Sequence, residues 1–217
     1  MLGFLRKVNP VILSMVSIDF FVNSALGTIS PFFAIFITGQ IAGGSATVAG
    51  FASATYWVVK SLFQLPIARW LDKTDGERDE FWAFFGGYLT TALVPIVYFF
   101  SREPWHIYFA QGLFGFAMAW AVPAWYSIFT RHIDKFRIGL EWSLYSVISI
   151  GISASLASAL GGLIIDRFGF RSIFLMASVL IFTSTFFIFG IKKYIYRKRR
   201  PLLKLIPEHK TSSGKMH

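Results

Sequence analysis

The sequence predicts an all-α membrane protein in which six transmembrane helices form one bundle. Hydrophobic residues make up 55% of the 217 residues and charged residues only 15%, whereas an average soluble chain carries about 25% charged residues. Six apolar stretches are each long enough for the roughly 20 residues that a bilayer-spanning helix needs. The connections between them are short, so consecutive helices must be antiparallel.

The predicted spans follow one another closely along the chain. The first is too long for the apolar region of a signal peptide and lacks a cleavage site, so we expect it to remain as a helix. Each of the first four carries a proline within it or near its end. Together with recurring Gly and Ala, these prolines either shape a bundle with a cavity or reflect how common both residue types are in membrane helices. The spans are 10–38, 47–71, 81–100, 105–130, 139–165 and 172–191.

The placement of Lys and Arg predicts the orientation in the membrane. If the N-terminus is cytoplasmic, the inner segments hold 17 basic residues and the outer loops hold only Arg102, Arg167 and Arg171, with Lys60 inside a span. By the positive-inside rule, both termini then face the cytoplasm. We therefore expect a multi-pass plasma-membrane protein, and the lack of a targeting signal favours a prokaryotic one.

The net charge of +10 is concentrated in a basic tail at residues 192–217. This segment holds nine basic residues and one acidic residue. The charge therefore argues against nucleic-acid binding and favours contact with anionic lipid head groups at the cytoplasmic face. Two prolines and a Ser- and Gly-containing end predict little order in the tail. The predicted organisation is a transmembrane domain over residues 1–191 followed by this tail.

Two segments of the chain share one pattern. Residues 68–78 (ARWLDKTDGER) and 162–171 (GLIIDRFGFR) both read small residue, three others, Asp, basic residue, then Gly and Arg. They lie near the ends of the second and the fifth predicted spans, which are equivalent places in two runs of three helices. This recurrence predicts a 3+3 inverted repeat.

The first of these segments resembles the loop between helices two and three of the major facilitator superfamily. That loop typically reads G-x-x-x-D-R-x-G-R-R. Asp72 and Lys73 match it, Ala68 takes the place of the first Gly, and Asp75 is a one-residue insertion before the second Gly.

Two further stretches resemble the same family. Residues 161–174 are similar to its G-G…G-W-R-x-x-F stretch around helices five and six. In the fourth span, Gln111 and Gly112 fit its R-x-x-Q-G motif, but Tyr108 replaces the Arg. The proton-relay role of that Arg in some exporters is therefore not carried over to this chain.

The resemblance covers nearly the whole chain, but only as half of a usual family member with its twelve helices in two halves. It implies secondary transport of a small-molecule substrate by alternating access, with the second half supplied by a parallel homodimer. Two alternatives are pairing with a different six-helix half, and a half-length membrane protein with a structural or regulatory role and no transport.

Asp19 is predicted to lie deep in the first span, where an ionisable side chain is by default a functional candidate. Asn23, Gly27 and Pro31 follow at steps of four, which predicts a stripe of polar and small residues suited to a cavity wall. A carboxyl group in an apolar site is also a natural proton carrier. We therefore expect substrate or proton binding at Asp19 and Asn23.

Lys60 lies at a matching depth in the second span, flanked by Tyr56 and Gln64 at steps of four. From the helical rise, Asp19 is about 14 Å and Lys60 about 16 Å from the cytoplasmic end. Antiparallel neighbours are therefore expected to bring the two charges together. Either these residues bind substrate or a proton, or the pair is static and fastens the first helix to the second.

The fifth span carries another polar stripe, formed by Glu141, Tyr145, Ser149 and Ser153. We interpret Glu141 as a favourable acid in the first turn of a helix. Tyr145 is a candidate cavity-lining residue, and so is Gln111 in the fourth span.

The resemblance also implies a gate at Asp72. In the family this Asp helps to close the inner face against a helix of the opposite half. Here the counterpart would be the fifth helix of a second copy, whose start lies near Arg131 and Arg137. The alternative is a solvated loop charge.

Several other classes of protein are excluded or disfavoured. No H-E-x-x-H motif, phosphate loop or cysteine is present, so we expect no enzyme activity, cofactor or metal. A six-helix channel lacks a recognisable filter motif. The seven tryptophans fall mostly near predicted span ends, as an interfacial belt would place them.

Overall fold

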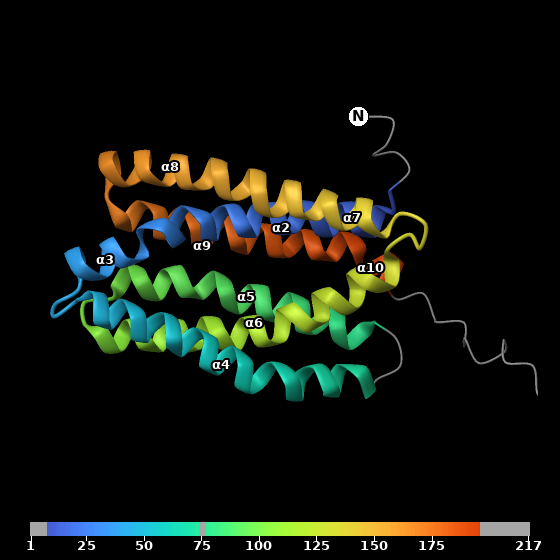
Figure 1. The fold of residues 1–217 in the computed structure, drawn as a ribbon, viewed down its shortest axis with the longest axis horizontal. Helices are drawn as coiled ribbons and strands as arrows, with labels where there is room; N and C mark the ends of the chain where they lie inside the picture. Colours follow the sequence, from blue (N-terminus) through green and yellow to red (C-terminus); the bar gives the residue numbers. More distant parts are fainter. Residues whose placement is uncertain (1–7, 74–76, 196–217) are drawn as a thin grey trace, which may run out of the picture.

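The computed structural model describes residues 8–73 and 77–195, and all secondary structure in these ranges is helical. The helices form six rods, which lie roughly parallel or antiparallel in Figure 1. They match the six predicted spans to within three residues at every end except the last, where α10 continues the sixth rod to Ile195, beyond the predicted end at 191. In chain order the rods are α2 (Pro10–Ile29) with η1 (Ser30–Phe32) and α3 (Phe33–Gln40); α4 (Ala46–Lys73); α5 (Arg78–Phe100); α6 (Pro104–His132); α7 (Ile138–Tyr145) with η2 (Ser146–Ile152) and α8 (Ser153–Phe168); and α9 (Phe170–Phe186) with η3 (Phe187–Ile191) and α10 (Lys192–Ile195).

Five of the six rods are long and apolar enough to cross a membrane. The exception is α4, which has sufficient length at 28 residues. Polar residues such as Lys60 and Gln64 reduce its apolar character. The prediction of a multi-pass bundle therefore holds, with α4 as its least apolar long helix.

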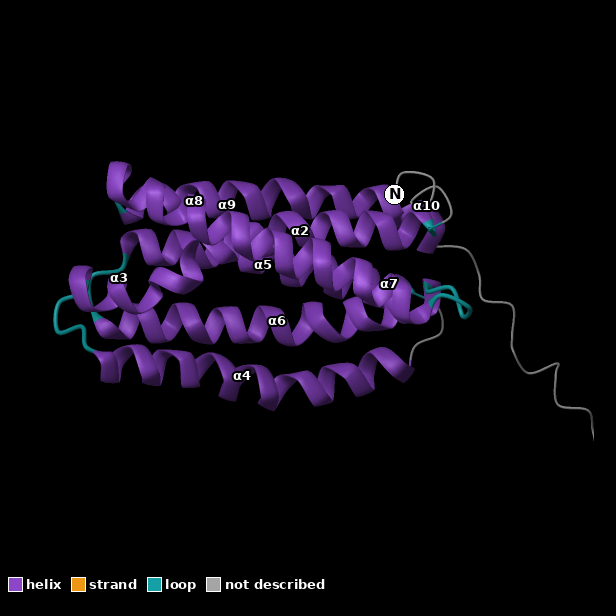
Figure 2. Cartoon of the chain, turned by 45° about the horizontal axis from the view of Figure 1, so that its top comes forward, coloured by secondary structure: helices purple, strands orange, loops and turns teal. Residues whose placement is uncertain are grey.

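The rods pack in a defined order across the bundle. α4 packs on α6, α6 on α5, α5 on α9, α9 on α2, and α2 on α8. Figures 1 and 2 accordingly show α4 at one edge of the bundle and α8 at the other. The middle is filled by aromatic and branched side chains, and Phe81, Phe84, Phe129 and Phe174 are almost completely buried.

Irregular segments interrupt three rods: the first, the fifth, and the sixth, where the 3-10 segment η3 separates α9 from α10. In the first, Pro31 lies in the 3-10 turn η1 between α2 and α3, because a proline ring is incompatible with the preceding turn of a regular α-helix. In the fifth, η2 is a π-helical segment. Ser149 in this segment donates a hydrogen bond to the Val16 carbonyl oxygen at 2.8 Å, which fastens the π segment to α2.

Two glycines allow neighbouring helices to approach closely. A Cβ atom at Gly115 of α6 would lie 2.5 Å from the Tyr56 carbonyl oxygen of α4. A Cβ atom at Gly161 of α8 would lie 2.8 Å from the Thr28 carbonyl oxygen of α2. Both distances are shorter than van der Waals contact, so these two helix pairs require glycine at the crossing.

The beginning of α2 and the short helix α10 lie at the same end of the bundle (Figure 1). We call this the α10 end. Of the predicted basic tail at 192–217, the structure describes only Lys192–Ile195, which form α10. The remainder of the predicted tail, and the predicted cytoplasmic residues Arg6 and Lys7, lie outside the described residues.

Candidate functional site

Two adjoining hollows open between the rods. The first has a volume of about 190 Å³ and contains Asp19, so we call it the carboxylate hollow. The second has a volume of about 310 Å³ and is lined mainly by aromatic and aliphatic side chains, so we call it the aromatic hollow. Leu26, Tyr56 and Phe114 line both hollows. The two spaces are therefore neighbours along the same inner wall.

Asp19 is buried in the carboxylate hollow with 3% of its surface exposed. The Tyr88 hydroxyl of α5 donates a hydrogen bond to Asp19 Oδ1. The Tyr145 side chain, at the end of α7, lines the same hollow beside this carboxyl group. A buried carboxylate is costly unless donors surround it. These two phenols, brought from distant parts of the chain, therefore make the site tolerable for a charge.

The predicted stripe that starts at Asp19 does not form a single cavity wall. Asn23 lines the carboxylate hollow beside Asp19. Gly27 instead faces α8, where an added Cβ atom would lie 3.0 Å from Ala157 Cβ. A step of four residues turns a helix by about 40° beyond a full turn, so three steps rotate the face by about 120°. This drift is why only the first two members of the stripe reach the hollow.

Lys60 does not pair with Asp19, which corrects the prediction that their matched depths bring the two charges together. No ion pair within 4.0 Å joins them in the described part of the chain. The reason is lateral: α4 packs on α6, whereas α2 packs on α8 and α9. The Lys60 ammonium instead lies over the rings of Trp57 and Tyr56, at 5.0 and 5.6 Å from their centroids.

The other predicted binding residues divide between the hollows. Tyr145 lines the carboxylate hollow, Gln111 lines the aromatic hollow, and Tyr56 lines both. Lys60 and Gln64 line neither of them. The structure therefore brings five of the seven predicted substrate or proton residues to one continuous region.

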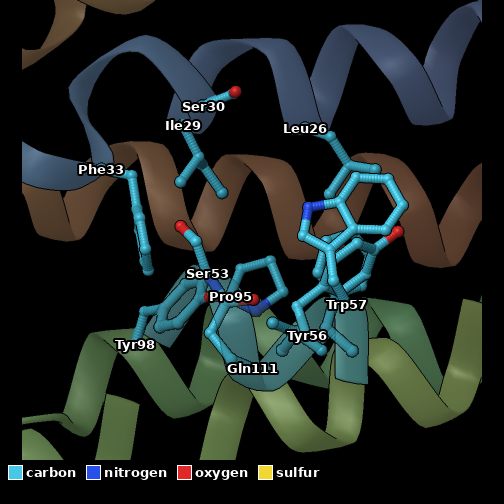
Figure 3. Close-up of a pocket in the computed structure, with 12 residues that line it drawn as sticks. Leu26, Ile29, Ser30, Phe33, Ser53, Tyr56, Trp57, Pro95, Tyr98 and Gln111 are labelled. Atoms are coloured by element: carbon cyan, nitrogen blue, oxygen red, sulfur yellow. The ribbon is translucent and has the colours of Figure 1, made fainter. Parts of the chain in front are cut away.

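The aromatic hollow is enclosed by four rods. Figure 3 shows side chains from the α2–α3 rod, α4, α5 and α6 surrounding it. Its polar groups are few: the hydroxyls of Ser30, Ser53 and tyrosines, the indole N–H of Trp57, and the amide of Gln111. Such a lining suits a small molecule with an apolar body and few hydrogen-bonding groups.

Trp125 was not identified as a site residue from the sequence, where it belonged to the expected interfacial belt. The structure buries it to 4% exposure and places it in the wall of the carboxylate hollow. Its ring stacks on Phe129, with centroids 4.6 Å apart. Within the described residues, its Nε1 donor has no hydrogen-bond acceptor. No local sequence signal distinguishes this buried tryptophan from an interfacial one.

The predicted gate residues lie at the α10 end. Asp72 is exposed at the end of α4. Arg131 binds a carboxylate of its own chain, with Nη1 2.6 Å from Glu80 Oε1. Arg137 Nε lies 3.8 Å from Asp134 Oδ2. The gate therefore stays a prediction, and the nearly buried Glu80–Arg131 pair is a feature that sequence spacing did not indicate.

Glu141 occupies the first turn of α7, as its interpretation as a helix-start acid requires. It is buried, and its Oε2 accepts a hydrogen bond from the Asp134 backbone N–H at 3.1 Å. This contact closes the loop between α6 and α7. Among the described residues, no group of three or more His, Cys, Asp or Glu side chains is positioned to hold a metal ion.

Comparison with known proteins gives one family and one fold. The sequence matches the family model of the Major Facilitator Superfamily over residues 13–214. Its structure is similar to a solved structure described as the POT family transporter PepTSo, with a TM-score of 0.70 and 16% sequence identity. The alignment covers 90% of this chain and 39% of that one, so the chain spans about two fifths of the solved protein. No curated protein sequence matches significantly.

Proposed function

The chain belongs to the major facilitator superfamily, and on that basis we propose that it forms half of a secondary transporter for a small molecule. Family and fold both indicate a transporter rather than an enzyme. The observation that carries the proposal is the buried Asp19 carboxyl group, which lines a hollow that adjoins a second, aromatic one. An apolar route with one ionisable group suits the binding and release of a substrate across a membrane.

We propose that the six rods form a 3+3 inverted repeat. The packing order supports this: exchanging the first three rods with the last three converts the contact of α4 with α6 into that of α8 with α2. The same exchange converts the contact of α5 with α6 into that of α9 with α2. A repeat of this kind places the substrate region between the two sets of three helices.

A second six-helix half is needed to enclose the pathway, and we propose a parallel homodimer. The chain aligns with only 39% of the solved transporter chain. Its edge helices expose large apolar side chains, Leu62 and Leu65 on α4 and Leu160 and Leu163 on α8. A two-fold axis along the membrane normal would bring these edges against those of a second copy. A different six-helix half would use the same edges.

Within this proposal, Asp19 is the group that binds and releases a proton. In the ionised state the carboxylate accepts a hydrogen bond from Tyr88, which ties α2 to α5, and it lies beside Tyr145 of α7 in the same hollow. In the protonated state one Asp19 oxygen carries a hydrogen and becomes a donor, so surrounding tyrosine hydroxyls that act as donors no longer match the carboxyl group. Protonation therefore changes the interactions between three rods, which is how one proton is coupled to a change between inward- and outward-open states.

We further propose that Asp72 closes the inner face against Arg137 of the partner subunit. Arg137 has only a 3.8 Å contact to Asp134 in its own chain, and its side chain is 35% exposed. Arg131, the other predicted gate residue, is engaged by Glu80, so it is the weaker candidate for a contact between subunits.

The test of this function is efflux from liposomes that contain the purified full chain and are loaded with a metabolite extract. Released compounds are measured by mass spectrometry with the exterior acidic or neutral. We expect compounds released above empty liposomes, and Asp19→Asn should abolish release or its dependence on the proton gradient. Asp166→Asn, which changes an exposed Asp of α8, is the matched control and should behave like the wild type.

Two results would contradict the proposal. Unchanged release and pH dependence in Asp19→Asn would remove the proton role. A strictly monomeric chain in mild detergent, with no release of any compound, would favour the non-transporting alternative.

Cysteine pairs at positions 72 and 137 test the gate, because an intersubunit crosslink is expected in one conformational state only.

A further inference from the structure

A third hollow lies at the end of the bundle opposite α10. At this end α5 is followed by the loop to α6, and α8 is followed by the turn into α9. Its volume is about 530 Å³. The lining comes from the end of α3, the loop after α5, and the turn between α8 and α9, three segments that meet at this end in Figure 1. It shares Tyr98 with the aromatic hollow but contains none of the residues proposed above for transport.

Two arginines line this hollow, Arg102 and Arg171. The predicted outer loops hold only three basic residues in all, so two of these three gather at one cavity. The third, Arg167, lies on the same turn but does not line it. We therefore call this space the arginine hollow.

No carboxylate balances these two positive charges. The lining contains no Asp or Glu, and in the described ranges neither Arg102 nor Arg171 forms an ion pair within 4.0 Å. The neighbouring acid Glu103 is not part of the lining, and its Oε2 accepts a hydrogen bond from Trp105 Nε1 at 2.8 Å. The lining therefore carries two positive charges and no negative one.

Both arginines are held by contacts within the chain, Arg102 through its backbone and Arg171 through its side chain. The Ala42 N–H donates a hydrogen bond to the Arg102 carbonyl oxygen at 2.9 Å, which joins the loop after α5 to the turn before α4. The Arg171 guanidinium lies over the Phe99 ring at 5.5 Å from its centroid. Because the Arg102 backbone and the Arg171 side chain are held without any ligand, ligand binding has to order mainly the Arg102 side chain.

From this geometry we propose that the arginine hollow binds a phosphate oxyanion. Guanidinium forks match phosphate and carboxylate oxygens in pairs. The four oxygens of a phosphate monoester or diester are arranged tetrahedrally, so two forks can approach the group from different sides, whereas a carboxylate has two oxygens in one plane. The amide of Gln40 adds a further donor. The remaining walls are aromatic, with Phe36, Phe170 and Phe174 among them, which suits an apolar group attached to the phosphate. The source is either a phospholipid head group or a soluble organic phosphate.

The test compares binding by the purified full chain and by the double variant Arg102→Gln/Arg171→Gln. Native mass spectrometry counts bound phosphatidylglycerol, and isothermal titration calorimetry measures binding of glycerol 3-phosphate at fixed ionic strength. We expect the double variant to bind at least about tenfold more weakly, because each hydrogen-bonded charge pair contributes about that factor. Arg167→Gln is the matched control and should bind like the wild type. All variants keep the basic tail, so any lipid that the tail binds does not contribute to the difference between the variants.

The two probes separate the sources. Loss confined to phosphatidylglycerol identifies a lipid head group, and loss confined to glycerol 3-phosphate identifies a soluble phosphate; both support the site. Wild-type binding of both probes by the double variant would overturn the proposal, and so would an equal loss in Arg167→Gln. The single variants, Arg102→Gln and Arg171→Gln, are measured in the same way, so the test stays decisive if the double variant is unstable.

Discussion

Replacing Arg131 by Met is expected to destabilise the bundle strongly. Arg131 Nη1 lies 2.6 Å from Glu80 Oε1, and the Glu80 side chain is only 1% exposed. Ser127 Oγ also donates a hydrogen bond to Glu80 Oε1, at 3.3 Å, but this neutral hydroxyl cannot replace the positive charge of a guanidinium group. Without Arg131 the carboxylate is left buried and uncompensated, which costs about 3–5 kcal/mol.

The magnitude translates into a measurable shift. For a chain of this size, about 1 kcal/mol moves the melting temperature by about 2–4 °C, so we expect a decrease of about 6–20 °C. The assay is size-exclusion chromatography of the detergent-solubilised chain after heating, with the remaining folded peak recorded against temperature.

A second substitution tests the mechanism rather than the site. In Glu80→Gln/Arg131→Met the buried charge is absent, so the double variant should be more stable than Arg131→Met alone. Arg137→Met is the matched control: its contact to Asp134 is 3.8 Å long with 35% and 43% of the two side chains exposed, so the expected cost is under about 1 kcal/mol. If the double variant melts no higher than Arg131→Met, the reasoning from an uncompensated charge is wrong.

Two further predictions use neighbouring positions as controls. Gly115→Ala should lower the free energy of unfolding by about 1–3 kcal/mol, because its new Cβ atom would lie 2.5 Å from a carbonyl oxygen of α4. Gly112→Ala is the control. Its Cβ atom would have no neighbour nearer than 4.0 Å, so it should be neutral or slightly stabilising in the same melting assay. Tyr88→Phe removes the donor to Asp19 and should cost about 1.5–3 kcal/mol. Tyr98→Phe, an equally buried tyrosine of α5, should cost less; equal melting points for the two variants would argue against a stabilising role of the Asp19 contact.

The six rods were predictable because a bilayer imposes both a length and a composition on each span. The π-helical segment at Ser146–Ile152 was not, since its residues are ordinary for an apolar helix and it depends on packing against α2. Likewise, Pro66, Pro95 and Pro123 lie inside continuous helices, so a proline alone did not mark where a rod would break.

The candidate site was only half predictable. Depth along a helix follows from residue number, so Asp19 was correctly placed as a buried acid. The angular position of each helix does not follow from residue number, so the expected partner Lys60 was wrong and the observed partner Tyr88, 69 residues away in the chain, was missed. The Glu80–Arg131 pair was missed for the same reason.

The position of Lys60 at the middle of α4 has a consequence for how the chain is made. A lysine at the centre of a helix opposes the release of that helix into lipid by about 2.5–3.5 kcal/mol on insertion scales. Among the six rods, α4 is the one that is not apolar enough to qualify as a membrane span by composition. Its most extensive neighbour is α6, which is synthesised later. We therefore expect α4 to be held at the translocon, or to enter the bilayer only loosely, until α6 has emerged to receive it.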